Sequence, residues 1–431
     1  MTTLVEMKTK LQDLGVNPDT FCFAPYINVD LDQTGETYVC CASKQSIGNW
    51  KTDKIKNQYN SSQMQELRSS LYNGEKHSSC RSCWFAESKN SKSTRLDSFN
   101  DAIEYIDDLQ NFVGDIKQNV DMSSTDNIKR MEIRLSALCN LKCAHCSPKY
   151  STQWINTLTE KSNFDFFKDY GEFEDNLSHD NINKYFSTSL HSNSKHENDI
   201  KEMLSNTNLI QFAGGEPLLS PEHVSWLEYL VNVAKTSKMQ TIEYNTNLMI
   251  KDIEKFFDLW KQFKSVTLRS SIDTDFDSIE YFRANSDKNL LKNNIKKIHQ
   301  LENVDNIGTV TFNMTSALRY KNIMHDWIEY DLNFHCSIVH NHPFSCLELP
   351  AKLHKQCVAD MQWCKDNVHK YTDNNKFVKR FKKYTDYCIN FITNHTPKTH
   401  MSKSTIEYIK FYDKVTDKNI LDFFPELEEY V

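Results

Sequence analysis

The sequence predicts an α/β protein built around a partial (β/α)6 barrel of the TIM type. Two further parts flank it: a small cysteine-rich α+β domain before it and a helical extension after it. From residue 131 onward, candidate strands alternate with helical patterns, as parallel βα units do. The first hundred residues have a hairpin pattern of their own, and the last eighty carry Lys, Tyr and Phe at helical spacing. These three observations define the predicted fold class.

The barrel strands are expected at six strand-like segments: 131–138, 209–213, 240–246, 265–272, 307–314 and 334–339. The helices between them are expected at 221–235, 251–263, 287–301 and 320–330. Ser220 and Pro221 form a helix-start signal for the first of these helices. A doubly wound open sheet is the competing topology, and periodicity alone does not separate the two.

Four regions follow from this pattern. Residues 1–100 form the cysteine-rich domain, 101–130 a helix and polar linker, 131–345 the barrel, and 346–431 the helical extension. The polar stretch 171–201 is expected to be an insertion in the barrel. We interpret its three histidines, His179, His191 and His196, as members of a solvated loop rather than as metal ligands.

Bulk composition narrows the class of protein. The chain has 431 residues, more than the roughly 150 of one domain, and 39% of them are hydrophobic, enough for a packed core. A net charge of −7 gives no sign of general nucleic-acid or membrane binding, and no apolar run reaches the roughly 18 residues that span a bilayer. The first residues also lack the apolar core of a signal peptide, so a cytoplasmic location is expected.

The thirteen cysteines therefore point to metal binding rather than to disulfides. Three of them, Cys139, Cys143 and Cys146, lie on one short loop, 139-CNLKCAHC-146, directly after the first predicted strand. Three thiolates can hold three irons of a [4Fe–4S] cluster and leave the fourth open to another ligand. A zinc site with His145 as fourth ligand is the alternative, although neighbouring side chains such as His145 and Cys146 rarely converge on one ion.

The loop resembles the CxxxCxxC signature of the radical S-adenosylmethionine (SAM) superfamily, in which the residue before the third cysteine is often aromatic or His. Residues Gly214, Gly215, Glu216 and Pro217 follow the next strand and resemble the motif of that superfamily that binds the amino group of SAM. The resemblance implies further SAM contacts at later strand ends and on the helix after them: Asn247, Ser271, Asp273 and Arg283. His145, beside the third cysteine, is also expected to lie at the cofactor.

A second cysteine group lies near the N-terminus. Alternating residues 27–31 and 37–39 around Gly35 predict a hairpin with cysteines at its base, and Cys80 and Cys83 form a CxxC pair. Such a group can hold an iron–sulfur cluster or zinc. The stretch resembles the SPASM or twitch auxiliary-cluster domain, which implies one [4Fe–4S] cluster on Cys22, Cys40, Cys80 and Cys83. Cys41, next to Cys40, is the other candidate ligand. The family usually carries this domain after the barrel, whereas here it comes first.

The function that these resemblances imply is that of a radical SAM enzyme. It would cleave SAM reductively to a 5′-deoxyadenosyl radical and remove hydrogen from an unidentified substrate, which is a peptide, a protein or a small molecule. A reductant such as flavodoxin or ferredoxin is the expected partner. The alternative is a non-catalytic zinc- or iron–sulfur-binding scaffold. The five cysteines beyond residue 335 lack ligand spacing, so we expect them to be packed thiols.

Overall fold

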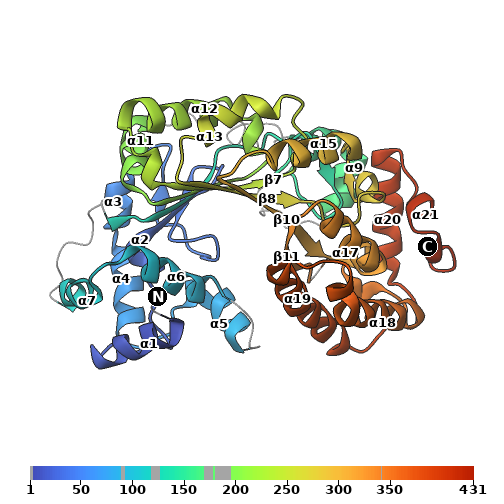
Figure 1. Ribbon diagram of the computed structural model, residues 1–431, viewed down its shortest axis with the longest axis horizontal. Helices are drawn as coiled ribbons and strands as arrows, with labels where there is room; N and C mark the ends of the chain where they lie inside the picture. The colour runs from blue at the N-terminus through green and yellow to red at the C-terminus, as the bar shows by residue number, and fades with distance from the viewer. Residues whose placement is uncertain (1–2, 89–92, 118–126, 169–177, 180–195, 341) are drawn as a thin grey trace. The chain divides into compact units, whose positions relative to one another are not determined.

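The computed structural model describes residues 3–88, 93–117, 127–168, 178–179, 196–340 and 342–431 (Figure 1). The chain forms two compact units. The first comprises Met1–Ser136, Ser187–Glu243 and Leu259–Val266, and the second comprises Ala137–Phe186, Tyr244–Asp258 and Thr267–Val431. Strands β7 (Thr241–Thr246) and β8 (Ser265–Ser271) contribute residues to both units.

The sheet of the first unit contains the N-terminal hairpin. Its other strands are β1 (Asn28–Leu31), β2 (Glu36–Tyr38), β3 (Gly48–Asn49), β4 (Arg130–Arg134) and β6 (Leu209–Ala213). The order is β7-β6-β4-β1-β2-β3, with β6, β4 and β1 parallel and the last two pairings antiparallel. The predicted hairpin is confirmed, and β1 adds it directly to the edge of β4.

The helical segments of the first unit are α1 (Leu4–Asp13), α2 (Ala24–Ile27), α3 (Ile55–Tyr59), α4 (Ser62–Tyr72), η1 (Ser78–Cys80), α5 (Arg81–Ser88), α6 (Thr94–Tyr105), α7 (Leu109–Lys117), α11 (Glu197–Asn206), η4 (Pro217–Leu219), α12 (Pro221–Glu228), η5 (Tyr229–Ala234) and η6 (Ser237–Met239). As predicted, α12 begins at Pro221 after Ser220. Phe21, Phe23 and Phe99 belong to one buried cluster of this unit. The ring of Phe23 contacts those of Phe21 and Phe99 edge to face. This packing fixes the segment that carries Cys22.

The second unit continues the parallel sheet. Its remaining strands are β5 (Lys142–Cys143), β9 (Arg283–Ala284), β10 (Val304–Phe312) and β11 (Asn333–Ile338). The order is β11-β10-β8-β7, while β5 and β9 form a separate antiparallel pair. The β10–β11 pairing is parallel, with Ile307 opposite Asn333.

All six predicted barrel strands are therefore present, as β4, β6, β7, β8, β10 and β11. Each of them is hydrogen-bonded to the strand that follows it in this series. A doubly wound sheet reverses its strand order at a switch point, and no reversal occurs among these strands. The α/β class with a large parallel sheet is confirmed, and the doubly wound alternative is wrong.

The helical segments of the second unit are α8 (Thr152–Thr157), α9 (Lys161–Lys168), η7 (Ile253–Phe256), α14 (Ile279–Phe282), α15 (Lys288–Ile298), α16 (Met314–Leu318), α17 (Tyr320–Glu329), η8 (Cys346–Glu348), α18 (Ala351–Asn367), η9 (Val368–Lys370), α19 (Asn375–Thr393), α20 (Lys403–Thr416), α21 (Ile420–Phe423) and η10 (Pro425–Leu427). α13 (Phe257–Trp260) lies at a boundary between the units. The predicted helical extension is confirmed: α19 packs on β11 and α18 on α17 (Figure 1).

Most of the predicted insertion at 171–201, including His191, lies outside the described residues. Two of its histidines are described. A ring nitrogen of His179 lies 2.6 Å from the backbone oxygen of Thr159, and one of His196 lies 3.3 Å from that of Thr52. The last residues of the predicted loop, 197–201, instead belong to α11.

Candidate functional site: two cysteine groups

The loop that carries Cys139, Cys143 and Cys146 is held by its own neighbours in the second unit. Cys143 pairs with Arg283 across the short β5–β9 ladder, and the N–H of Ala144 donates to the oxygen of Phe282 at 2.8 Å. The indole N–H of Trp154 donates to the oxygen of Cys143 at 3.0 Å. The start of α8 supplies two more donors, with the hydroxyl of Ser151 bonded to Leu141 O and that of Thr152 to Cys139 O. The backbone of the loop is thus fixed before any ligand binds.

The three thiols of this loop are close enough to influence one another. Burial raises the pKa of Cys146 to about 12, and the negative charge of Cys139 adds to that effect. Burial likewise raises the pKa of Cys143 well above its ordinary value. Without a metal, such raised pKa values favour the protonated thiols of Cys143 and Cys146. A metal ion or cluster is what would hold them as thiolates, because metal binding requires and stabilises the deprotonated form.

The distance between ligand sulfurs distinguishes a single zinc ion from an iron–sulfur cluster. Four thiolates around one zinc ion, about 2.3 Å from it, lie roughly 3.8 Å apart, whereas each ligand of a [4Fe–4S] cluster binds a different iron and stands further from the others. Among the described residues, no three cysteine sulfurs lie within 4.8 Å of one another. Neither described cysteine group is therefore as compact as the ligands of one zinc ion.

Asn247, predicted at the cofactor, lies beside the loop. Its side-chain N–H group is 3.8 Å from the sulfur of Cys139 and donates to the side-chain oxygen of Asn140 at 2.9 Å. Its own oxygen accepts from the N–H of Met249. Asn247 thus links the end of β7 to the cysteine loop.

Asp273, Arg283 and His145 come together at the loop. The Arg283 guanidinium forms a buried ion pair with Asp273, which also accepts from the N–H of Thr311 at 2.7 Å. Burial opposes ionisation of Asp273, but Arg283, His145 and the N–H of Thr311 together outweigh it and lower the pKa of that carboxyl. The His145 ring stacks on Phe282 at 5.0 Å and its Nε2 lies 4.0 Å from Asp273.

These contacts define what each group can offer a ligand. The Nε atom of Arg283 and the Nδ1 atom of His145 are buried and have no hydrogen-bond partner among the described residues. Burial lowers the pKa of His145, so its ring is neutral. Ser271, the last residue of β8, is partly exposed two residues before Asp273.

The Gly214–Pro217 turn belongs to the first unit. Gly214 has φ 105°, and a Cβ atom there would lie 2.9 Å from the backbone oxygen of Ser136, so glycine is required. The N–H of Gly215 donates to that same oxygen at 2.9 Å. Glu216 is buried, and its Oε1 accepts from the N–H of Leu218 where η4 begins at Pro217. The turn is thus attached to the end of β4.

Sequence reasoning missed two tyrosines of α20. The hydroxyl of Tyr412 donates to Lys142 O at 2.7 Å and also lies within hydrogen-bonding distance of Phe282 O, while that of Tyr408 donates to Ala144 O at 3.0 Å. Both are buried. Their spacing of four residues places them on one helix face, but aromatic residues at that spacing usually mark only a packed core, so the sequence held no specific signal.

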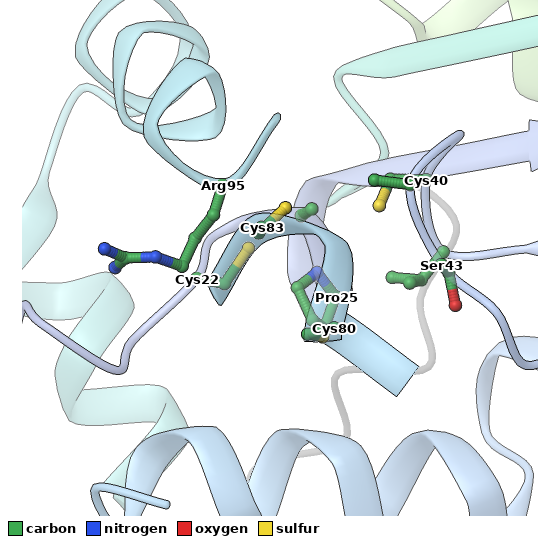
Figure 2. Close-up of a pocket in the computed structure, with 10 residues that line it drawn as sticks. Cys22, Pro25, Cys40, Ser43, Cys80, Cys83 and Arg95 are labelled. Carbon is green, nitrogen blue, oxygen red and sulfur yellow. The ribbon is translucent and has the colours of Figure 1, made fainter. Parts of the chain in front are cut away.

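The second group of cysteines lies entirely in the first unit. Cys22, Cys40, Cys80 and Cys83, the four predicted ligands, line one pocket together with Arg95, Pro25 and Ser43 (Figure 2). They come from four places: the segment before α2, the loop after β2, η1 and α5. Cys41 is exposed and does not line this pocket. Of the two neighbouring cysteines, Cys40 is thus the one placed with the other three.

Arg95 brings a positive charge to this pocket. Its guanidinium pairs with Glu87 and donates to the backbone oxygens of Pro18 and Phe21, each at 2.8 Å. Burial raises the pKa of Cys80 and of Cys83, and Arg95 partly offsets that rise for both. Burial also raises the pKa of Cys22, to about 12. The pocket therefore provides four cysteine sulfurs beside a fixed cation; Cys22 and Cys83 are buried, and Cys40 and Cys80 are partly exposed.

Comparison with known families identifies this segment. Residues 22–84 match the SPASM iron–sulfur cluster-binding domain. The range spans all four cysteines of the pocket, so the predicted SPASM-type iron–sulfur domain is confirmed. Its position ahead of the parallel strands is also as the sequence indicated. A search of curated protein sequences finds no match for the chain.

Several solved structures show a distant likeness. One is anSMEcpe with bound AdoMet (12% identity, TM-score 0.34, covering 56% of this chain and 61% of that one). Others are SuiB of Streptococcus suis (12% identity, TM-score 0.36, 71% and 63%) and SuiB bound to its precursor peptide SuiA (13% identity, TM-score 0.36, 69% and 60%). The chain thus matches about three fifths of the length of each. Likeness at this level carries no argument about activity.

Within the described part of the chain, no helix combines the length and the apolar character needed to cross a bilayer.

Proposed function

We propose that this protein is a radical SAM enzyme whose catalytic [4Fe–4S] cluster is held by Cys139, Cys143 and Cys146. The observation that carries the proposal is the loop itself. Its three cysteines are mutually interacting yet more widely spaced than ligands of one zinc ion, on a backbone fixed by surrounding donors. A three-cysteine set leaves one iron of such a cluster open to an exogenous ligand.

When bound, the cluster supplies the electron that cleaves SAM to methionine and a 5′-deoxyadenosyl radical, which removes a hydrogen atom from the substrate. The residues of this chain would bind and orient SAM. Arg283, with its buried and unpartnered Nε, is suited to a carboxylate, and Asp273 holds its guanidinium in place. Asn247 keeps Cys139 and the end of β7 together.

Glu216 is proposed to bind the ammonium group of SAM. The N–H of Gly215 is bonded to the backbone oxygen of Ser136, and two residues lie between Ser136 and Cys139 in the sequence. The buried carboxylate of Glu216 can attract a cation at the edge of the sheet.

The pocket of Cys22, Cys40, Cys80 and Cys83 is proposed to hold an auxiliary [4Fe–4S] cluster. Four protein ligands would close this cluster, so it would not bind SAM. A small electron carrier such as flavodoxin or ferredoxin is the proposed reductant. The substrate class stays open between a peptide, a protein and a small molecule.

A non-catalytic zinc scaffold is the other function considered. It requires compact cysteine sites, and the described cysteines are not arranged in that way. It also gives no role to the glycine turn attached to β4 or to the unpartnered Nε of Arg283. No observation favours it.

The proposal is tested by anaerobic reconstitution with iron and sulfide. Two clusters correspond to about eight irons per chain. With SAM and a strong reductant, the reconstituted protein should form 5′-deoxyadenosine. Full iron content without SAM cleavage would contradict the catalytic assignment but would still support the presence of two clusters.

A further inference from the structure

Two carboxylates lie directly opposite each other in the first unit. Asp30 on β1 and Glu132 on β4 are partners in the parallel register of these strands. Opposed residues of neighbouring strands project from the same face of a sheet. Like charges in this arrangement destabilise a sheet, and burial increases the cost. Asp30 is only 1% exposed and Glu132 only 8%.

One arginine neutralises part of the negative charge of this carboxylate pair. Arg134, two residues after Glu132, donates to Oδ1 of Asp30 at 2.5 Å and to Oε1 of Glu132. The nearest other guanidinium, that of Arg130, is bonded to Asp101 and to the side-chain oxygen of Gln211. Asp97 and Asp101 line the same pocket as the carboxylate pair and add negative charge. The pair is thus left with more negative than positive charge.

The second carboxylate oxygen of Asp30 forms no hydrogen bond with any described residue. This atom, Oδ2, is buried. A buried carboxylate oxygen without a partner costs free energy, and such atoms normally find a hydrogen bond or an ion. The position therefore points to a ligand that the protein itself does not supply.

A third donor faces the two carboxylates. The sulfur of Cys41 and one oxygen from each of Asp30 and Glu132 all lie within 4.8 Å of one another, the one such trio among the described residues. Cys41 is exposed, so an ion has a route to the trio from solvent. Thiolate and carboxylate donors at this spacing suit a single ion, in contrast to the wider cysteine groups.

We propose that Asp30, Cys41 and Glu132 form a mononuclear site for a divalent transition-metal ion, with zinc as the representative ion. A thiolate favours zinc and related ions over magnesium or calcium, which prefer oxygen ligands. Three protein ligands would leave a fourth position for water. Arg134 can stay in place, because it uses Oδ1 and Oε1. The site gives Cys41 a role distinct from that of Cys40, whose sulfur group lines the four-cysteine pocket.

The test uses the full chain, reconstituted anaerobically with iron and sulfide so that the cluster ligands are occupied. Weakly bound metal is removed with a mild chelator, and Zn²⁺ is then added. The expected result is about one zinc per chain after desalting, with X-ray absorption at the zinc edge showing one sulfur at about 2.3 Å and oxygens at about 2.0–2.2 Å. A shell of three or four sulfurs, or no retained zinc, would overturn the proposal.

Variants locate the ion. Asp30→Asn and Glu132→Gln should each weaken zinc binding at least tenfold while iron content stays at the wild-type level. Asp97→Asn, which changes a carboxyl of the same pocket outside the trio, should leave zinc affinity within about twofold. Equal zinc affinity in Asp30→Asn, Glu132→Gln and wild type would overturn the site. If a variant loses iron and fails to fold, the sulfur count of wild-type zinc still decides the question.

This site is independent of the proposed SAM chemistry. The Cys80→Ala/Cys83→Ala double variant should keep the zinc and its one-sulfur shell. Loss of zinc in that variant would show that the ion had occupied the four-cysteine pocket instead. Because zinc and SAM cleavage are measured separately, failure of either proposal is recognised without the other.

Discussion

The hydroxyl of Tyr412 on α20 donates to the backbone oxygen of Lys142, 2.7 Å away and one residue before Cys143. This contact connects two segments that are 270 residues apart in the sequence. It makes α20, a helix of the C-terminal extension, a structural support of the cysteine loop.

Replacing Tyr412 with Phe should therefore weaken the loop. The change removes the hydroxyl donor from the partly buried backbone oxygen of Lys142, at a cost of about 1–3 kcal/mol. We expect faster loss of loop-cluster iron under a chelator challenge, measured by iron release over time. Tyr384→Phe is the control, because that ring contacts Phe334 and His335 instead of the loop. Equal iron release from both variants would mean that Tyr412 does not support the cluster.

The Asp273–Arg283 pair predicts a second effect. Asp273→Asn leaves a buried guanidinium without its counter-charge, which typically costs about 3–5 kcal/mol of folding free energy. The exposed pair Asp277–Lys288 provides a control, since Asp277→Asn should cost less than about 1 kcal/mol. Chemical denaturation of the two variants measures the difference. Similar stabilities would show that the buried pair contributes little.

Glu216 separates SAM binding from cluster binding. Glu216→Ala should weaken SAM binding by about 1.5–3 kcal/mol, the range for a charge-assisted hydrogen bond, without loss of loop iron. Glu216→Gln keeps a side-chain oxygen for the N–H of Leu218 and removes the charge. Calorimetric titration with SAM should place the Gln variant near Ala. If both variants bound SAM with wild-type affinity, Glu216 would have a role only in the turn.

The four-cysteine pocket predicts independent assembly. Cys80→Ala/Cys83→Ala should lower the iron content by about four per chain and leave the loop cluster with its SAM-sensitive electron-spin resonance signal. Cys357→Ala/Cys364→Ala, a pair of buried thiols on α18, should not change the iron content. If the wild type instead contained one zinc per chain and the iron of only one cluster, the pocket would be a zinc site and the auxiliary-cluster proposal would be wrong.

Much of this arrangement could be predicted from local sequence. Six strand–helix alternations, the start of α12 at Pro221 and the hairpin around Gly35 depend on nearby residues and proved correct. The four cysteines of the N-terminal pocket lie in the segment that matches the SPASM domain, and their role as ligands remains a prediction. The roles of the loop cysteines and of Gly214–Pro217 remain predictions.

The rest depended on contacts between distant residues. Nothing near β1 indicates that it pairs with β4 a hundred residues later, and only that pairing brings Asp30 beside Glu132. The role of Tyr412 likewise arises from a helix packing against a loop far away in the sequence. The ion pair of Arg283 with Asp273 was also unforeseen, because both residues were expected to face the cofactor singly.

The central claim is that the loop cysteines hold a catalytic cluster that cleaves SAM. The most direct measurement is anaerobic formation of 5′-deoxyadenosine by the reconstituted wild type and by the variant with Cys139, Cys143 and Cys146 all changed to Ala. The account predicts product from the wild type, and from the triple variant no product and about four fewer irons per chain. Unchanged iron content in the triple variant, or 5′-deoxyadenosine formed without these three cysteines, would contradict it.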